Sequence, residues 1–118
     1  MSVAGGPTFG LRLGGKAGYA ASYLTPPMFN LGSAARIKAA LDIPVIVAGR
    51  FTDPAEADRV IGEGLVDMVG QARELLADPL LPTKLEEGRL DEIRPCIGYN
   101  ECHMMHQSPI NMLCAVNP

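Results

Sequence analysis

Three cysteines lie in the last quarter of this 118-residue chain, and they are its clearest chemical signal. Cys96 and Cys102 bound the stretch CIGYNEC, and Cys114 follows in LCAVNP. Thiolates gathered in this way bind zinc or iron–sulfur groups. The cysteine count is odd and no secretory signal is seen, which favours a reducing compartment, the cytoplasm, over a disulfide framework. The spacing predicts a metal site but does not identify the metal.

Two arginines follow small residues where predicted strands end. They stand in the pairs Gly49-Arg50 and Ala72-Arg73. In α/β folds the working residues lie at such strand ends. A small residue lets backbone N–H groups approach an anion, and an arginine adds a bidentate partner for phosphate. The pattern favours a phosphate site. Spacing alone leaves open an alternative, in which Gly49 forms a turn and the arginines form surface salt bridges.

Two short apolar runs must position these residues. Ile43–Ala48 is rich in β-branched residues, and Val66–Gly70 is similar. Short continuous apolar runs of this kind are typical of strands buried on both faces, as in parallel sheets. Residues 1–32 are rich in glycine and proline and predict a long loop, after a short strand at Met1–Ala4.

Helices are predicted between and after the strands. Ser33 is the expected cap of a helix over Ala34–Leu41. Asp53, followed by proline and then Glu56, predicts a second helix with a capping box, which Gly64 would end. Further helical turns are expected over residues 78–88. The alternation of helices and strands indicates an α/β fold with parallel strands.

Composition excludes some classes of function. The net charge is −3, so no nucleic-acid surface is indicated, and no apolar run is long enough to span a membrane. Aromatic residues make up only 5% of the chain, and tryptophan is absent. A self-sufficient core of this size usually holds more, so we expect the chain to be part of a larger domain.

One long segment resembles a known family. The sequence IPVIVAGRFTDPAEADRVIGEGLVDMVGQARELLADPLLPTKLEEGRLDEIRPCIGYNEC is similar to the C-terminal part of the Old Yellow Enzyme-like NADH:flavin oxidoreductases. It is most similar to their iron–sulfur branch, the 2,4-dienoyl-CoA reductases and trimethylamine dehydrogenases. The upstream stretch YLTPPMFNLGSAARIKAAL fits the same family, so the resemblance covers nearly the whole chain.

The resemblance implies the C-terminal part of a TIM (β/α)8 barrel, with the two apolar runs as strands seven and eight, flanked by helices. Residues 1–92 would form this portion of an FMN-binding barrel, where loops after these strands commonly bind phosphate. By position, the residues implied to contact the FMN phosphate are Gly49, Arg50, Ala72 and Arg73. In a partial barrel, we expect Val45, Val47 and Met68 to face solvent or a partner.

Residues 93–118 resemble the cysteine segment of the iron–sulfur branch. Cys96, Cys102 and Cys114 match the first, third and fourth cysteines of that motif, and Tyr99 stands at the second. A [4Fe–4S] cluster needs one ligand for each iron, so this motif is degenerate. The alternative is a zinc site of Cys₃His type, in which His106 adds the fourth ligand.

The implied protein is an FMN-dependent NAD(P)H:flavin oxidoreductase that reduces activated alkenes or oxidises amines. Its expected partners are FMN, NAD(P)H and a small-molecule substrate, with no nucleic acid and no membrane; an oligomer is compatible with the sequence. No residue here is a credible general acid or hydride acceptor, so the chain is expected to be an inactive piece of that enzyme. The alternative function is a non-catalytic zinc-binding remnant.

Overall fold

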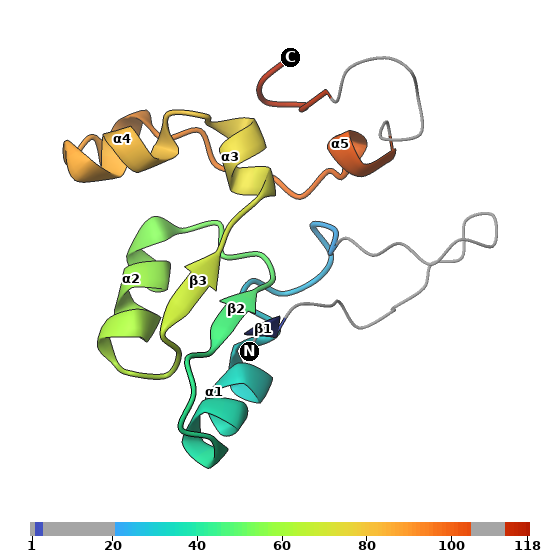
Figure 1. Cartoon of the computed structure of the whole chain (residues 1–118). Coiled ribbons are helices and arrows are strands. Elements are labelled where there is room, and N and C mark those ends of the chain that lie inside the picture. Colours follow the sequence, from blue (N-terminus) through green and yellow to red (C-terminus); the bar gives the residue numbers. More distant parts are fainter. Residues whose placement is uncertain (1, 4–20, 105–112) are drawn as a thin grey trace.

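A small parallel sheet organises the chain, as seen in a computed structural model that describes residues 2–3, 21–104 and 113–118 (Figure 1). The sheet has the order β1-β2-β3, formed by Ser2–Val3, Ile46–Ala48 and Met68–Gly70. Both strand pairs are parallel, so the predicted α/β class is confirmed. The predicted strands of five and six residues were too long. The N–H of Val45 binds the Asp67 carboxylate at 2.7 Å instead of a neighbouring strand.

Two helices cover the sheet. α1 spans Leu31–Ala40 and α2 spans Pro54–Gly62. The Asp53 carboxylate caps α2 by accepting from the N–H of Ala55 at 2.9 Å, as predicted. Glu56 does not complete a capping box; it pairs with Arg59. The prediction that Ser33 caps this helix was wrong, because α1 begins two residues before Ser33.

The hydrophobic core lies between the sheet and these helices. Val45 and Val47 are fully buried there, against Ala34 of α1 and Val60 of α2. The expectation that Val45 and Val47 face solvent was therefore wrong. Met68 is 46% exposed, as expected, because its place in the strand turns it to the opposite, uncovered face of the sheet.

Short helices follow β3 and lead to the cysteine segment. α3 spans Arg73–Ala77, α4 spans Leu81–Glu86, the 3₁₀ turn η1 spans Leu90–Glu92 and α5 spans Glu101–Met104. The turns predicted over residues 78–88 are present in α4, whereas α3 was not predicted. In Figure 1, β2 and β3 point toward the part of the molecule that holds α3, α5 and the C-terminus.

A buried carboxylate ties these helices together. Asp78 is fully buried, and its side chain accepts from Lys84 Nζ at 2.6 Å and from the N–H of Arg94 at 3.0 Å. The Lys84 ammonium also donates to the Glu92 carbonyl at 2.8 Å. Asp78 thereby fixes the chain that leaves η1, two residues before Cys96.

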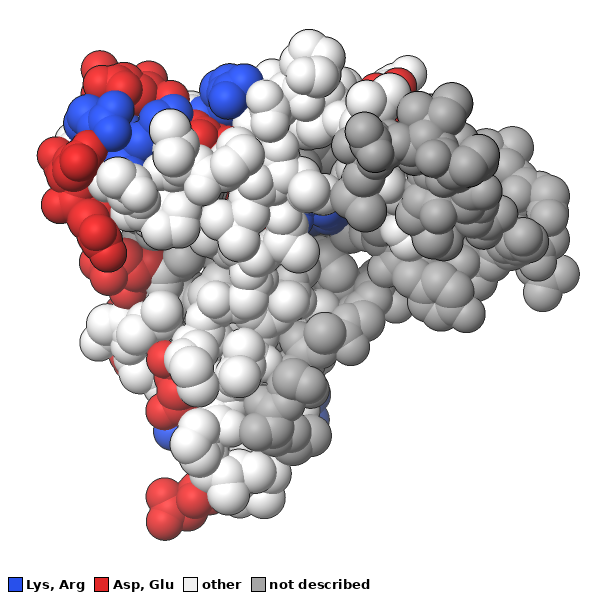
Figure 2. Space-filling view, turned by 45° about the horizontal axis from the view of Figure 1, so that its top comes forward, with Lys and Arg blue, Asp and Glu red and all other residues white. Residues whose placement is uncertain are grey.

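Charged side chains gather at one side of the face in Figure 2, where acidic and basic groups lie next to one another. Several are paired: Arg59 bridges Glu56 and Glu63 on α2, and Arg89 bridges Glu87 and Glu92. Among the described residues, no helix has the length and apolar character needed to cross a membrane.

Candidate functional site

The ends of β2 and β3 lie at one edge of the sheet. Ala48 and Gly70 are partners in the parallel register, so the residues that follow them emerge side by side. These are Gly49-Arg50 after β2 and Gln71-Ala72-Arg73 after β3. The Gln71 amide donates to the Phe51 carbonyl at 2.7 Å and joins the two loops. The two predicted phosphate-binding pairs are thus brought to the same edge.

Gly49 has a conformation and surroundings that only glycine suits. Its φ is 142°, and a Cβ placed on it would lie 2.8 Å from Phe29 Cε1 and 2.9 Å from Asn30 Nδ2. Asn30 cannot withdraw easily, because its amide donates to the Ala48 carbonyl at 2.7 Å. The backbone after β2 is therefore packed closely against the loop that precedes α1.

Gly49→Ala should lower the free energy of unfolding by roughly 1–3 kcal/mol, because it adds backbone strain and a steric clash together. The matched control is Gly62→Ala at the end of α2, where a Cβ would meet nothing within 4 Å. The control should raise stability by about 0.5 kcal/mol. Chemical denaturation measures both. Equal stability of Gly49→Ala and the wild-type protein would contradict the close packing described for this loop.

Arg50 crosses from the end of β2 to the loop before α1. Its φ is 54°, in the left-handed region, and its Nη1 donates to the carbonyls of Tyr23, at 3.1 Å, and Thr25. Its Nε is buried and has no hydrogen-bond partner among the residues that the structure describes. A buried N–H without an acceptor is costly, so Arg50 presents a donor that an anion at this edge would satisfy.

Ala72 and Arg73 do not simply face the strand edge where a phosphate site was predicted. The N–H of Ala72 donates a hydrogen bond to the buried Glu74 carboxylate at 3.2 Å. The Arg73 Nη1 donates to the Ala21 carbonyl at 2.6 Å and to the Asn100 side-chain oxygen. Arg73 therefore begins at the strand edge but reaches into the cysteine segment.

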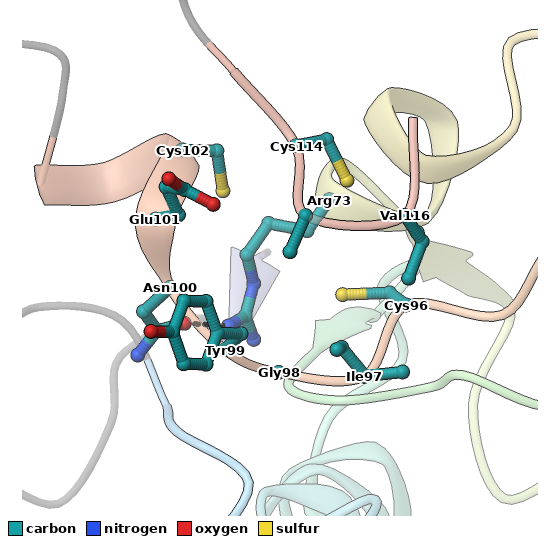
Figure 3. Close-up of a pocket in the computed structure, with 11 residues that line it drawn as sticks. Arg73, Cys96, Ile97, Gly98, Tyr99, Asn100, Glu101, Cys102, Cys114 and Val116 are labelled. Atoms are coloured by element: carbon teal, nitrogen blue, oxygen red, sulfur yellow. Dashed lines mark hydrogen bonds between the residues drawn. The ribbon is translucent and has the colours of Figure 1, made fainter. Parts of the chain in front are cut away.

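The three cysteines meet in one pocket of about 290 Å³, which includes the solvent at its mouth (Figure 3). Cys96 comes from the loop after η1, Cys102 from α5 and Cys114 from the C-terminal segment. Their sulfur atoms point toward the space between them in Figure 3, and Arg73 lines the same pocket. The structure thus brings together all three cysteines that the sequence singled out.

Hydrogen bonds hold the walls of this pocket. The Asn117 amide donates to the Leu76 carbonyl at 3.0 Å and its oxygen accepts from Arg94 at 2.9 Å, which fixes the chain near Cys114. On the other side, the N–H of Tyr23 donates to the Gly98 carbonyl at 2.9 Å. The pocket is therefore anchored to the helices and to the loop before α1.

The thiols influence one another. Burial raises the pKa of the Cys102 thiol, and Cys96 and Cys114 raise it further, whereas the Arg73 guanidinium lowers it. Three thiolates confined here would repel one another, so their ionised form needs a cationic partner. A metal or a cluster core supplies such a partner.

The pocket offers three sulfur donors to a metal centre. Within the part of the chain that the structure describes, no group of three or more His, Cys, Asp or Glu residues lies close enough to hold one metal ion. Zinc needs its sulfur ligands within about 2.3 Å of one ion. In an iron–sulfur cluster each thiolate binds its own iron, so the sulfurs stand farther apart. His106, the proposed fourth zinc ligand, lies outside the described residues.

Sequence reasoning missed four charged residues around the site. Glu74, Asp78 and Lys84 are buried, and Glu101 lines the cysteine pocket. Charged residues are rarely buried without partners, so from their residue types alone these four were expected to be exposed to solvent. The one available signal was Asp78-Pro79 before a helical turn, a combination typical of a capping carboxylate.

Known proteins are similar to this chain in sequence. The sequence model of the NADH:flavin oxidoreductase / NADH oxidase family matches residues 21–92. Dimethylamine dehydrogenase of Hyphomicrobium sp. (strain x) is 50% identical over 66 residues, which are 56% of this chain and 9% of that enzyme. Cinnamate reductase of Clostridium sporogenes is 40% identical over 83 residues, 70% of this chain and 12% of that enzyme.

A solved structure agrees with these matches. That of 6-hydroxypseudooxynicotine amine oxidase from Pseudomonas geniculata N1 superposes with a TM-score of 0.75 at 34% identity, over 83% of this chain and 15% of that chain. The chain therefore spans less than a sixth of the length of each of these three proteins.

Proposed function

The chain belongs to the NADH:flavin oxidoreductase / NADH oxidase family, and we propose that it supplies an FMN phosphate site and an iron–sulfur pocket to a flavin-dependent oxidoreductase. The convergence of three cysteines beside the shared edge of β2 and β3 carries this proposal, because a cluster held there would lie next to the proposed phosphate site. In this proposal, residues 1–92 belong to the FMN-binding barrel and residues 93–118 form the segment that binds the cluster.

The barrel assignment makes β2 and β3 the seventh and eighth strands of a TIM barrel, with β1 in the sixth position. Their parallel order and the helices on one face support it. The exposed face around Met68 would then line the barrel interior. Phosphate groups commonly bind the loops after strands seven and eight of this fold.

FMN, when bound, accepts and donates hydride or single electrons. The residues proposed to hold its phosphate are Gly49, Arg50, Ala72 and Arg73. Gly49 allows close approach of the backbone, and Arg50 offers its buried Nε–H. Arg73 would add positive charge between the two cofactors. We assign none of the described residues a catalytic role.

The iron–sulfur pocket would be held by Cys96, Cys102 and Cys114, which supply thiolates from three separate segments. Such clusters transfer single electrons. All three cysteines are free thiols, which is consistent with the cytoplasm as the proposed compartment.

The proposed reaction is the oxidation of an amine or the reduction of an activated alkene, with NAD(P)H as the electron donor for the latter. Both directions are supported by relatives, a dimethylamine dehydrogenase and a cinnamate reductase. These names describe those proteins, and the substrate of this one is a proposal at the level of class only.

Arg50→Ala should weaken FMN binding by roughly 1.5–3 kcal/mol, the scale of a hydrogen bond to a charged group. Riboflavin has no phosphate, so its affinity should be unchanged in the same variant. Fluorescence titration of the flavin-free protein measures both ligands. The control is Arg36→Ala, an exposed arginine on α1. Equal losses for FMN and riboflavin would contradict a phosphate contact and indicate a general disturbance of the loop.

A further inference from the structure

The cysteine pocket offers three thiolates, whereas a cube of four irons needs four ligands. The following inference rests on the proposed iron–sulfur function and concerns the missing ligand. Besides the cysteines, three residues that line the pocket carry side-chain oxygen atoms: Tyr99, Asn100 and Glu101.

Two of these residues are poorly suited to bind iron. Tyr99 is 57% exposed, and the hydroxyl of a phenol is a poor ligand for iron. The Asn100 side-chain oxygen accepts from Arg73, so it is already engaged. An amide oxygen also carries no charge to balance iron.

Glu101 has the chemistry that the other two lack. It precedes Cys102 directly in α5, and Figure 3 shows its carboxylate on the same side of the pocket as the Cys102 sulfur. Among the residues that the structure describes, no hydrogen bond or ion pair engages this carboxylate. Carboxylates are common ligands of protein-bound iron.

We propose that Glu101 supplies the fourth ligand of the cluster, in place of the thiolate that Tyr99 replaces. Three irons then have sulfur ligands from the protein and the fourth has an oxygen ligand. Iron in such clusters favours soft thiolate over carboxylate, so the iron bound to Glu101 is the most easily lost. Oxygen or a chelator should remove it first and leave a three-iron cluster.

The experiment compares the wild-type protein, Glu101→Gln, Tyr99→Cys and the double variant after anaerobic reconstitution with iron and sulfide. Iron and sulfide are assayed per FMN, and the oxidised proteins are examined by electron paramagnetic resonance. An oxidised three-iron cluster is paramagnetic, whereas an oxidised four-iron cube gives no signal. Glu86→Gln, at an exposed position on α4, is the control for the loss of one negative charge.

The wild-type protein and the control should hold about four irons, and Glu101→Gln about three, with the paramagnetic signal. Adding Tyr99→Cys to Glu101→Gln should restore about four irons and remove the signal, because a thiolate replaces the lost carboxylate. That rescue also shows that the Glu101→Gln protein is folded. Tyr99→Cys alone should make the cluster more resistant to chelators.

Two results would overturn the role of Glu101: four irons in Glu101→Gln, or three irons in the wild-type protein. Absence of iron from every variant, Tyr99→Cys included, would instead refute the iron–sulfur function and this proposal with it. FMN retained in those samples would show that the flavin site stands independently.

Discussion

Cys102→Ser is expected to leave a protein that binds FMN but contains almost no iron or sulfide. Cys102 is the most buried of the three cysteines, at 9% exposure, and it forms the α5 wall of the pocket. Its loss would leave only two thiolates, on the loop after η1 and the C-terminal segment. Two thiolates cannot hold a four-iron cube, and serine is a poor ligand for iron at neutral pH.

Iron and sulfide assays after anaerobic reconstitution test this expectation, with the visible spectrum recorded after the flavin is extracted. Serine is close to cysteine in size, so folding should be preserved, and FMN content reports on that. Zinc is measured in the same samples. One zinc per chain in the wild-type protein, without sulfide, would contradict the iron–sulfur proposal and favour the Cys₃His alternative.

Asp78→Asn is expected to have the second large effect, which is a loss of fold stability. The amide keeps the shape of the carboxylate but leaves the Lys84 ammonium without its counter-charge in a buried place. The N–H of Arg94 also loses a charged acceptor. Melting temperature should fall clearly more than for Asp67→Asn, whose partner Lys38 is 30% exposed. Cluster loading should fall too, because the chain before Cys96 is released.

The double variant Asp78→Asn, Lys84→Met is the matched control, since removing both partners of a buried pair is often far less harmful than removing one. It should recover part of the lost melting temperature. If Asp78→Asn melts like the wild-type protein, the buried pair does not organise this region.

Acidification should destabilise the wild-type protein in the same way as Asp78→Asn, because it removes the charge of Asp78. The hydrogen bond from Lys84, with that from the N–H of Arg94, lowers the pKa of Asp78 from 3.8 to about 2. A lowered pKa stabilises the fold when the group is ionised, so this contribution is complete above pH 3.8 and is lost as the pH falls toward 2. Between these pH values, Asp78→Asn should show a flatter decline in melting temperature than the wild-type protein.

The sequence predicted the parallel strands and α2 well, because those elements depend on local signals. The apolar, β-branched run IPVIVA predicted β2, although only Val45 and Val47 in it are buried, and Asp53 with Pro54 starts α2 where expected. The start of α1 was misjudged because Asn30 uses its side chain for the distant Ala48 carbonyl and gives α1 no side-chain cap. That contact joins residues far apart in sequence, so no local pattern reveals it.

The candidate site was predictable in its residues but not in its contacts. The three cysteines, Arg50 and Arg73 were all identified from their types and spacing. The sequence could not show that Arg73 turns from the strand edge toward Asn100, or that Glu101 lines the cysteine pocket. Both depend on how the chain returns past β3 after η1, which tertiary contacts decide.

The position of Arg73 has a thermodynamic consequence. Its backbone stands at the strand edge proposed for phosphate, whereas its guanidinium is bonded to Asn100 in the cysteine segment. A ligand at the strand edge that draws the guanidinium away must break these bonds. Linkage is reciprocal, so the factor by which that ligand changes cluster affinity equals the factor by which the cluster changes ligand affinity. The order in which the two cofactors are inserted would then affect the path of assembly, but not its end point.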